Sequence, residues 1–185
     1  MIYTLSLQTV GLLLGALLVV GHAIALLHAQ GIQQLLRAFP RSRGAGVVLL
    51  TLAAVWAFGL VAQIDLGEFS NYRPVFLGLI VVGYGLTLVF VPEFLAVRAL
   101  GMLCLLAAEP LLEVAFQRPE TSRLLLTVLA YLWAVLGIFW VGKPYLLRDQ
   151  IAWLCAGKGR WIAAALGGVV YGAALLAAAY FQYGA

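Results

Sequence analysis

Long apolar stretches separated by short polar segments dominate the chain. Six such stretches cover residues 5–27, 46–64, 75–92, 97–116, 124–142 and 161–181. Each is close to the roughly 17–25 residues that an α-helix needs to cross the hydrocarbon core of a bilayer. The pattern therefore predicts an all-α membrane protein, a single transmembrane domain over residues 1–185 built as a bundle of six transmembrane helices.

Two of the connecting segments have apolar positions at helical spacing. In residues 30–39, Ile32, Leu35, Leu36 and Phe39 share one face, and Arg37 falls opposite. Residues 145–154 repeat the arrangement, with the apolar face separated from charged positions. A short helix with one apolar face lies in the headgroup region rather than across the membrane. We therefore expect one or two short interfacial helices.

The composition agrees with a chain that faces lipid. Hydrophobic residues make up 65% and charged residues 10% of the 185 residues, whereas a soluble domain has about 25% charged residues. The net charge of +4 comes from basic residues that cluster in two connecting segments. We interpret them as topology signals and expect no nucleic-acid partner. The expected partners are the lipid bilayer and other membrane subunits or a second copy of the chain.

The basic residues also test whether residues 97–116 cross the membrane, because Glu109, Pro110 and Glu113 make this stretch the least apolar. Lys and Arg concentrate on the cytoplasmic side of membrane proteins. Six crossings put the basic segments 30–45 and 143–160 on the same side, whereas five would separate them. We therefore predict both segments cytoplasmic and both termini outside, in a bacterial inner (cytoplasmic) membrane. The first stretch has no basic residue ahead of it and is predicted to be a retained helix.

Two pairs of glycines have the G-x-x-x-G spacing. Gly11 and Gly15 lie in the first stretch, and Gly168 and Gly172 in the last. Such pairs remove side-chain bulk along one stripe, so that two helix backbones can approach closely. We predict that these glycines contact neighbouring helices within the bundle. Oligomerisation through the same stripes is the alternative.

Three polar residues are expected near the cytoplasmic ends of the helices. His22 is predicted to point into the bundle as a hydrogen-bonded residue, with a proton carrier as the alternative. His28 lies about 240° away around the same helix, so the two histidines cannot bind one haem or metal ion from one face. Glu93 and Arg98 flank a short turn and are predicted to form an interfacial ion pair. We predict no cofactor and no metal.

Glu109 is the intramembrane charge, about 12 Å from the outer end of its helix. Counted in the same way, Tyr131 lies at about 12 Å, Trp56 at about 13 Å and Tyr84 at about 15 Å. A polar group in hydrocarbon is costly when it has no partner, so Tyr131 is the predicted hydrogen-bond partner of Glu109. The candidate intramembrane polar site is therefore Glu109, Glu113, Tyr131, Tyr84 and Trp56.

Two interpretations of this site are open. Pro110 lacks an N–H group, which leaves the carbonyl of Leu106 without its helical donor. A free carbonyl beside a carboxyl group is suitable for a cation or a proton. Alternatively, Glu109 is a structural residue that stays protonated and hydrogen-bonded to a neighbouring helix.

No motif in the sequence identifies a function. The sequence contains no metalloprotease, nucleophile-elbow or nucleotide-binding pattern, and we predict no catalytic residue. The leading hypothesis is a non-enzymatic accessory, scaffold or assembly subunit of a larger membrane complex. The alternative is a small transporter or channel that uses Glu109, for which a short similarity between VVGYG at 81–85 and VVYG at 169–172 would be an inverted repeat. An intramembrane enzyme acting on lipid or quinone is the third hypothesis.

Overall fold

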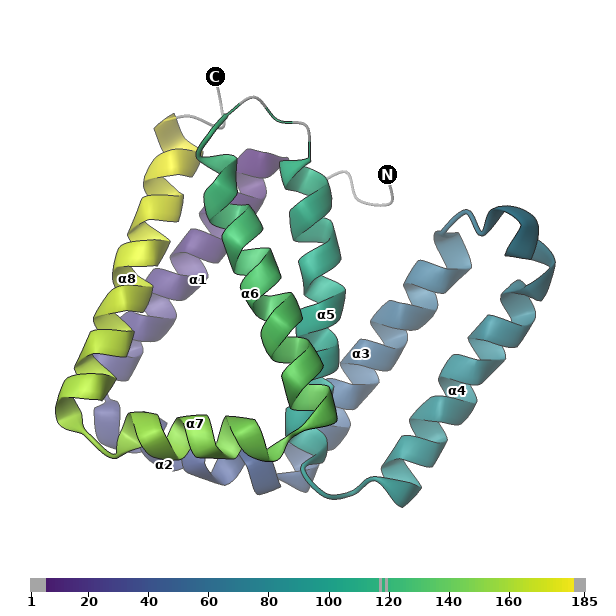
Figure 1. Ribbon diagram of the computed structural model, residues 1–185, viewed down its shortest axis with the longest axis horizontal. Helices are drawn as coiled ribbons and strands as arrows, with labels where there is room; N and C mark the ends of the chain where they lie inside the picture. The colour runs from purple at the N-terminus through teal and green to yellow at the C-terminus, as the bar shows by residue number, and fades with distance from the viewer. Residues whose placement is uncertain (1–5, 117, 119, 182–185) are drawn as a thin grey trace.

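The computed structural model describes residues 6–116, 118 and 120–181, and every regular element in those ranges is helical (Figure 1). Six helices are long and apolar enough to cross a membrane. They are α1 (Leu7–Leu27), α3 (Arg43–Gln63), α4 (Arg73–Phe90), α5 (Leu95–Ala115), α6 (Arg123–Gly142) and α8 (Lys158–Phe181). The short helices α2 (Ala29–Ala38) and α7 (Tyr145–Cys155) complete the set, with 3-10 turns η1 (Phe39–Arg41) and η2 (Gly67–Tyr72). The chain is an all-α integral membrane protein, which confirms the predicted fold class.

Several spanning helices begin before the apolar stretches from which they were predicted. Helix α3 begins at Arg43 rather than at residue 46, because the Ser42 hydroxyl accepts a hydrogen bond from the backbone N–H of Ala45 over 3.2 Å. Helix α4 carries Pro74 in its first turn, where the missing N–H would be unpaired in any case. A polar cap thus extends α3, and a proline in the first turn is accommodated in α4, beyond the apolar stretches of these spans.

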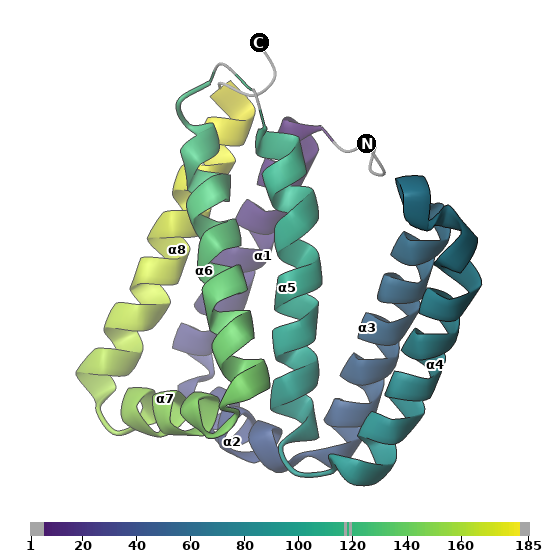
Figure 2. The same cartoon turned by 45° about the vertical axis from the view of Figure 1, so that its right-hand side comes forward.

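The spanning helices pack as three pairs (Figures 1 and 2). Helix α1, the first span, lies along α8, the last span, and α5 lies along α6. Helix α3 packs against both α5 and α4. Helix α5 is the most buried of the six spans. It therefore forms the centre of the bundle, between the α3–α4 pair and α6.

Glycines lie at three of these helix contacts. A Cβ at Gly15 would come within 2.9 Å of the carbonyl oxygen of Gly172, so α1 and α8 touch through their backbones. A Cβ at Gly137 would come within 2.8 Å of the carbonyl oxygen of Gly101, which joins α5 to α6 in the same way. Gly46 meets the backbone of Ala96 between α3 and α5. Small residues permit this close approach of helices in lipid.

The main hydrophobic core lies where α1, α5, α6 and α8 meet. Its members include Leu126 and Leu175, which are fully buried. The hydroxyl of Tyr171 on α8 donates to the carbonyl of Leu125 on α6 over 2.6 Å and links the two helix pairs. A smaller cluster of Leu50, Leu95 and Ala99 joins α3 to α5.

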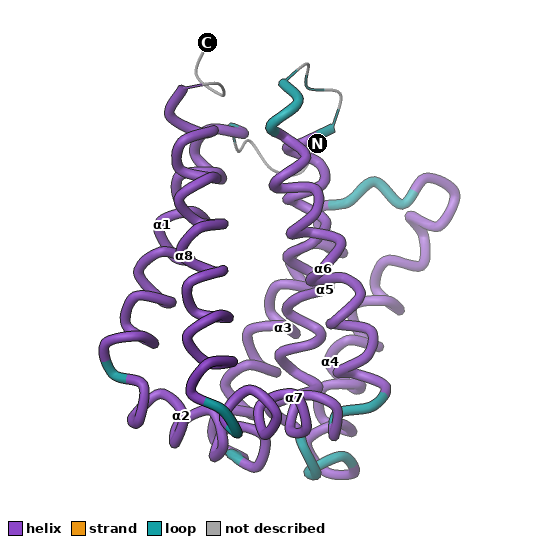
Figure 3. Tube along the Cα trace, turned by 60° about the vertical axis from the view of Figure 1, so that its left-hand side comes forward, coloured by secondary structure: helices purple, strands orange, loops and turns teal. Residues whose placement is uncertain are grey.

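Helices α2 and α7 lie at the same end of the bundle, across the ends of the spanning helices (Figure 3). We call these two helices the platform and the other end of the bundle the far end. The guanidinium of Arg37 on α2 donates to the carbonyl of Cys155 at the end of α7 over 3.2 Å. Both basic segments predicted from the sequence are therefore at one end of the molecule, as an even number of crossings requires.

The α3–α4 pair is attached more loosely than the other pairs. Helix α4 has no buried residue, and α3 and α4 diverge from α5 towards the far end (Figures 1 and 2). Arg73 ties the pair at its far end by donating to the carbonyls of Ala62 and Ile64. Between their ends, the two helices are joined by a hydrogen bond of 2.9 Å between Thr51 and Tyr84.

Candidate intramembrane site on helix α5

Helix α5 carries both intramembrane carboxylates of the predicted site. The helix is continuous through the buried Pro110. Glu109 is exposed, and in the described part of the chain its carboxylate has no hydrogen bond or ion pair. Glu113 is half-buried. Both line an open hollow of about 590 Å³ whose walls are Leu105, Ala108, Glu109, Leu112, Glu113 and Phe116.

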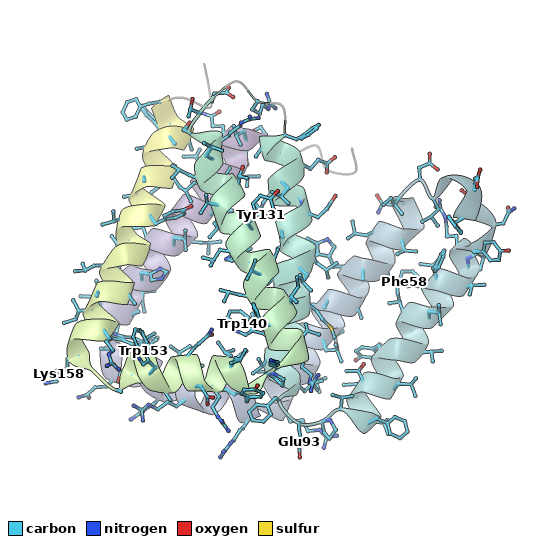
Figure 4. All side chains as sticks on the ribbon, viewed as in Figure 1. Phe58, Glu93, Tyr131, Trp140, Trp153 and Lys158 are labelled. Atoms are coloured by element: carbon cyan, nitrogen blue, oxygen red, sulfur yellow. The ribbon has the colours of Figure 1, made fainter. Side chains whose placement is uncertain are left out.

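The predicted hydrogen bond between Glu109 and Tyr131 is absent among the described residues. Tyr131 is 59% exposed on the outside of α6 (Figure 4). The two residues were predicted at equal depth, but their side chains do not face each other. In each helix the preceding residue is a buried alanine, Ala108 in α5 and Ala130 in α6. One residue turns the side chain by about 100° around the helix, so Glu109 and Tyr131 both point away from the surface on which α5 and α6 pack.

Tyr84 belongs to the α3–α4 contact instead. The hydroxyl of Thr51 donates to the carbonyl of Val47 over 2.8 Å. Since a hydroxyl has one proton, the bond between Thr51 and Tyr84 must be donated by Tyr84. Thr51 was missed at the sequence level, although it is the polar residue inside an otherwise apolar stretch. Trp56, also on α3, is half-buried.

Tyr84 also lines a second, apolar cavity between α3, α4 and α5, of about 440 Å³, which we call the three-helix groove. Small residues of α3, among them Ala53, Ala54 and Ala57, form one wall. Met102 and Leu105 of α5 form another, so the groove and the hollow beside Glu109 share Leu105.

Several residues of α5 that line the groove and the hollow lie along one line on the helix surface. Met102, Leu105, Glu109, Leu112 and Phe116 are spaced by alternating steps of three and four residues, and each is half-buried or exposed. We call these five residues the α5 seam. Positions at this spacing form the contact line of a packed helix pair. The seam thus has the spacing of a helix contact, and Glu109 lies at its middle.

At the platform end, Arg98 does not pair with Glu93, so the predicted ion pair is wrong. Glu93 is exposed at the turn between α4 and α5 (Figure 4). The guanidinium of Arg98 donates to the carbonyl of Val141 over 2.9 Å. The last carbonyls of a helix have no donor within the helix. The end of α6 therefore provides Arg98 with a hydrogen-bond acceptor inside the bundle, whereas Glu93 is exposed to solvent.

His22 is half-buried and points between α1 and α8. Its Nδ1 lies 2.8 Å from the carbonyl oxygen of Leu18. A carbonyl only accepts, so Nδ1 carries the proton. Gly15 and Gly172 contact each other as backbone, whereas Gly168 provides the space for the His22 ring. Gly11 is buried on α1.

The arrangement offers two acidic side chains on one helix, Glu109 and Glu113, and no gathered set of ligands among the described residues. Among the described residues, no three His, Cys, Asp or Glu side chains are close enough together to hold a metal ion. Comparison of the chain with protein-family models, with curated proteins and with solved structures gives no match. The geometry of this α5 surface is therefore the basis for assigning a function.

Proposed function

We propose that the protein is a non-enzymatic accessory or assembly subunit that binds a transmembrane helix of a partner along the α5 seam. The observation that carries the proposal is Glu109, an exposed carboxylate on an apolar helix face, with no hydrogen bond to any described residue. A charged side chain at the centre of a spanning helix costs about 2.5–3.5 kcal/mol even by the mildest scales. A partner helix with a hydrogen-bond donor at the same depth removes that cost.

The shape of the surface supports the same proposal. The seam has the three-four spacing of a helix contact, and α3 diverges from α5 towards the far end (Figure 2). The adjoining three-helix groove is lined by small residues of α3, and small residues are favoured where membrane helices associate. The groove has few polar groups that would recognise a polar solute.

Photo-crosslinking in the native membrane tests the proposal. A photoreactive residue replaces Leu112 on the seam, and the matched control replaces Val170, which is 67% exposed on α8. The expected result is a discrete protein adduct from position 112 and only lipid adducts from position 170. Glu109→Gln retains a carbonyl acceptor and should keep the adduct, whereas Glu109→Leu should lose it. Equal adducts at both positions contradict the proposal.

A synthetic helix tests the chemistry of the partner. Two apolar transmembrane peptides are compared, one with a single Lys about 12 Å from its outer end and one with Leu at that position. Energy transfer between peptide and full-length protein in vesicles should show association about tenfold stronger for the Lys peptide, because a polar contact between membrane helices is worth about 1–2 kcal/mol. Glu109→Leu should abolish the difference. No difference with the unmodified protein argues against the proposal.

A transporter or channel is the second candidate, favoured by the open hollow beside Glu109 and Glu113. In that case Glu109→Gln abolishes flux in proteoliposomes, whereas an accessory subunit tolerates it. The order of elements gives the inverted repeat no support. The interfacial helix follows the first span in residues 1–92 but the second span in the other half.

A further inference from the structure

Two arginines from different helices converge on the C-terminal end of α7. Arg37 of α2 donates to the carbonyl of Cys155, and Arg160 of α8 donates to the carbonyl of Trp153 over 3.3 Å. The Arg160 guanidinium also lies over the Trp153 ring, 4.7 Å from its centre. Lys158 lies at the corner where α7 meets α8, close to Trp153 (Figure 4). We call Arg37, Lys158 and Arg160 the basic corner.

The positive charge of the basic corner is not balanced by the chain around it. The sequence has no acidic residue before Asp65 and none after Asp149. Asp149 itself pairs with Arg148 over 2.8 Å. The carbonyls at the end of α7 contribute only about half a negative charge. Three exposed cations therefore remain, and each arginine keeps donors that its carbonyl partner does not use.

An apolar cavity of about 240 Å³ adjoins the basic corner, between α1, α2, α7 and α8. Leu36 and Leu154 line it, and they are the sequence neighbours of Arg37 and of its acceptor Cys155. The rest of the lining is mainly apolar and includes Leu17 and Ile32. Cationic groups that can bind an anion and a cavity that can hold an apolar chain are thus adjacent at the end of the membrane-spanning bundle.

We propose that the basic corner and this cavity bind an anionic phospholipid of the leaflet on the platform side. The phosphate accepts hydrogen bonds from Arg37, Arg160 and Lys158, and an acyl chain enters the cavity between Leu36 and Leu154. Arginine is suited to phosphate because its planar donors match the geometry of two oxygens. Basic pockets between membrane helices bind lipid head groups in this way. A soluble anion would leave the apolar cavity empty.

The test compares lipids with the same acyl chains on the delipidated full-length protein in mild detergent. Native mass spectrometry measures the affinity for phosphatidylglycerol and for phosphatidylcholine, and thermal unfolding is measured in parallel with each lipid and with inorganic phosphate. The expected result is at least tenfold tighter binding of phosphatidylglycerol. The double substitution R37Q/R160Q should remove this preference, with a loss of roughly 30-fold. Inorganic phosphate at the same concentration should not raise the unfolding temperature.

The matched control is R41Q/R43Q, which removes the same charge from η1 and from the first residue of α3 and should keep the preference. Lys158→Gln provides a second variant, because Lys158 has no hydrogen bond among the described residues and its loss leaves the packing intact. It should weaken phosphatidylglycerol binding roughly fivefold. If R37Q/R160Q and R41Q/R43Q lose the same amount of phosphatidylglycerol affinity, the preference comes from general surface charge and the proposal is overturned. So would equal binding of the two lipids, or stabilisation by inorganic phosphate that matches the lipid.

Discussion

The imidazole ring of His22 occupies the space that a side chain at Gly168 would need. Three ring atoms, including Nε2 at 2.3 Å, come within 2.4 Å of the position of a Cβ on that glycine. The ring is fixed there by its hydrogen bond to the carbonyl of Leu18. Gly168 is thus the place on α8 where a polar side chain of α1 is accommodated.

Gly168→Ala should therefore destabilise the bundle by about 1–3 kcal/mol, the usual cost of overpacking. The control is Gly167→Ala, because a Cβ at Gly167 meets nothing within 4 Å and alanine favours a helix. Unfolding in detergent measures both. Combining Gly168→Ala with His22→Ala should recover most of the loss, and a strictly additive double variant would contradict the contact.

Gly137→Ala should separate α6 from α5. Its Cβ would meet the carbonyl oxygen of Gly101 at 2.8 Å, and a backbone atom cannot rotate away as a side chain can. We expect a loss of stability of about 1–3 kcal/mol, measured by the same unfolding assay. Gly142→Ala on the same helix meets nothing within 4 Å and should be neutral. Similar effects of the two substitutions are the result that would refute this packing.

Tyr84→Phe should loosen the α3–α4 pair. The substitution removes the hydroxyl that donates to Thr51, a contact worth about 0.6–2 kcal/mol in a membrane. Spin labels on Phe58 and Leu79 should report a broader distance distribution between α3 and α4. Tyr131→Phe is the control, because Tyr131 is exposed and should leave the distribution unchanged. A larger effect at position 131 than at position 84 would contradict the role of this hydrogen bond.

Cysteines placed one at a time at Ser42 and Ser70, after Cys104 and Cys155 are replaced by alanine, should be labelled from opposite sides of the membrane. Ser42 precedes α3 at the platform end, and Ser70 lies in η2 beyond the other end of α3. The basic residues at the platform end predict that Ser42 faces the cytoplasm. A membrane-impermeant thiol reagent added to intact cells checks this. Labelling of both positions from one side is incompatible with six crossings.

The apolar pattern was sufficient to predict the six spans and both platform helices, because length and periodicity are local properties of the sequence. Position along a helix can also be counted from the sequence, which is how Glu109 and Tyr131 were predicted to lie at one depth. The direction of a side chain around its helix was not predictable, because it depends on which surface each helix packs. Glu109 and Tyr131 show this limit, since counting predicted that they would meet and both side chains point away from the contact between α5 and α6. The partners of Arg98 and Tyr84 were missed for the same reason.

The contact between the first span and the last has a consequence for biogenesis. When α1 leaves the ribosome, the helix that packs against Gly15 has not been made, and α8 ends only at Phe181. At about 5–20 residues per second, the wait lasts roughly ten to thirty seconds. During that time α1 stays in the bilayer with its glycine stripe unpaired. The bundle can therefore close only after α8 has been synthesised, and a chain truncated before α8 leaves α1 available to membrane chaperones and proteases.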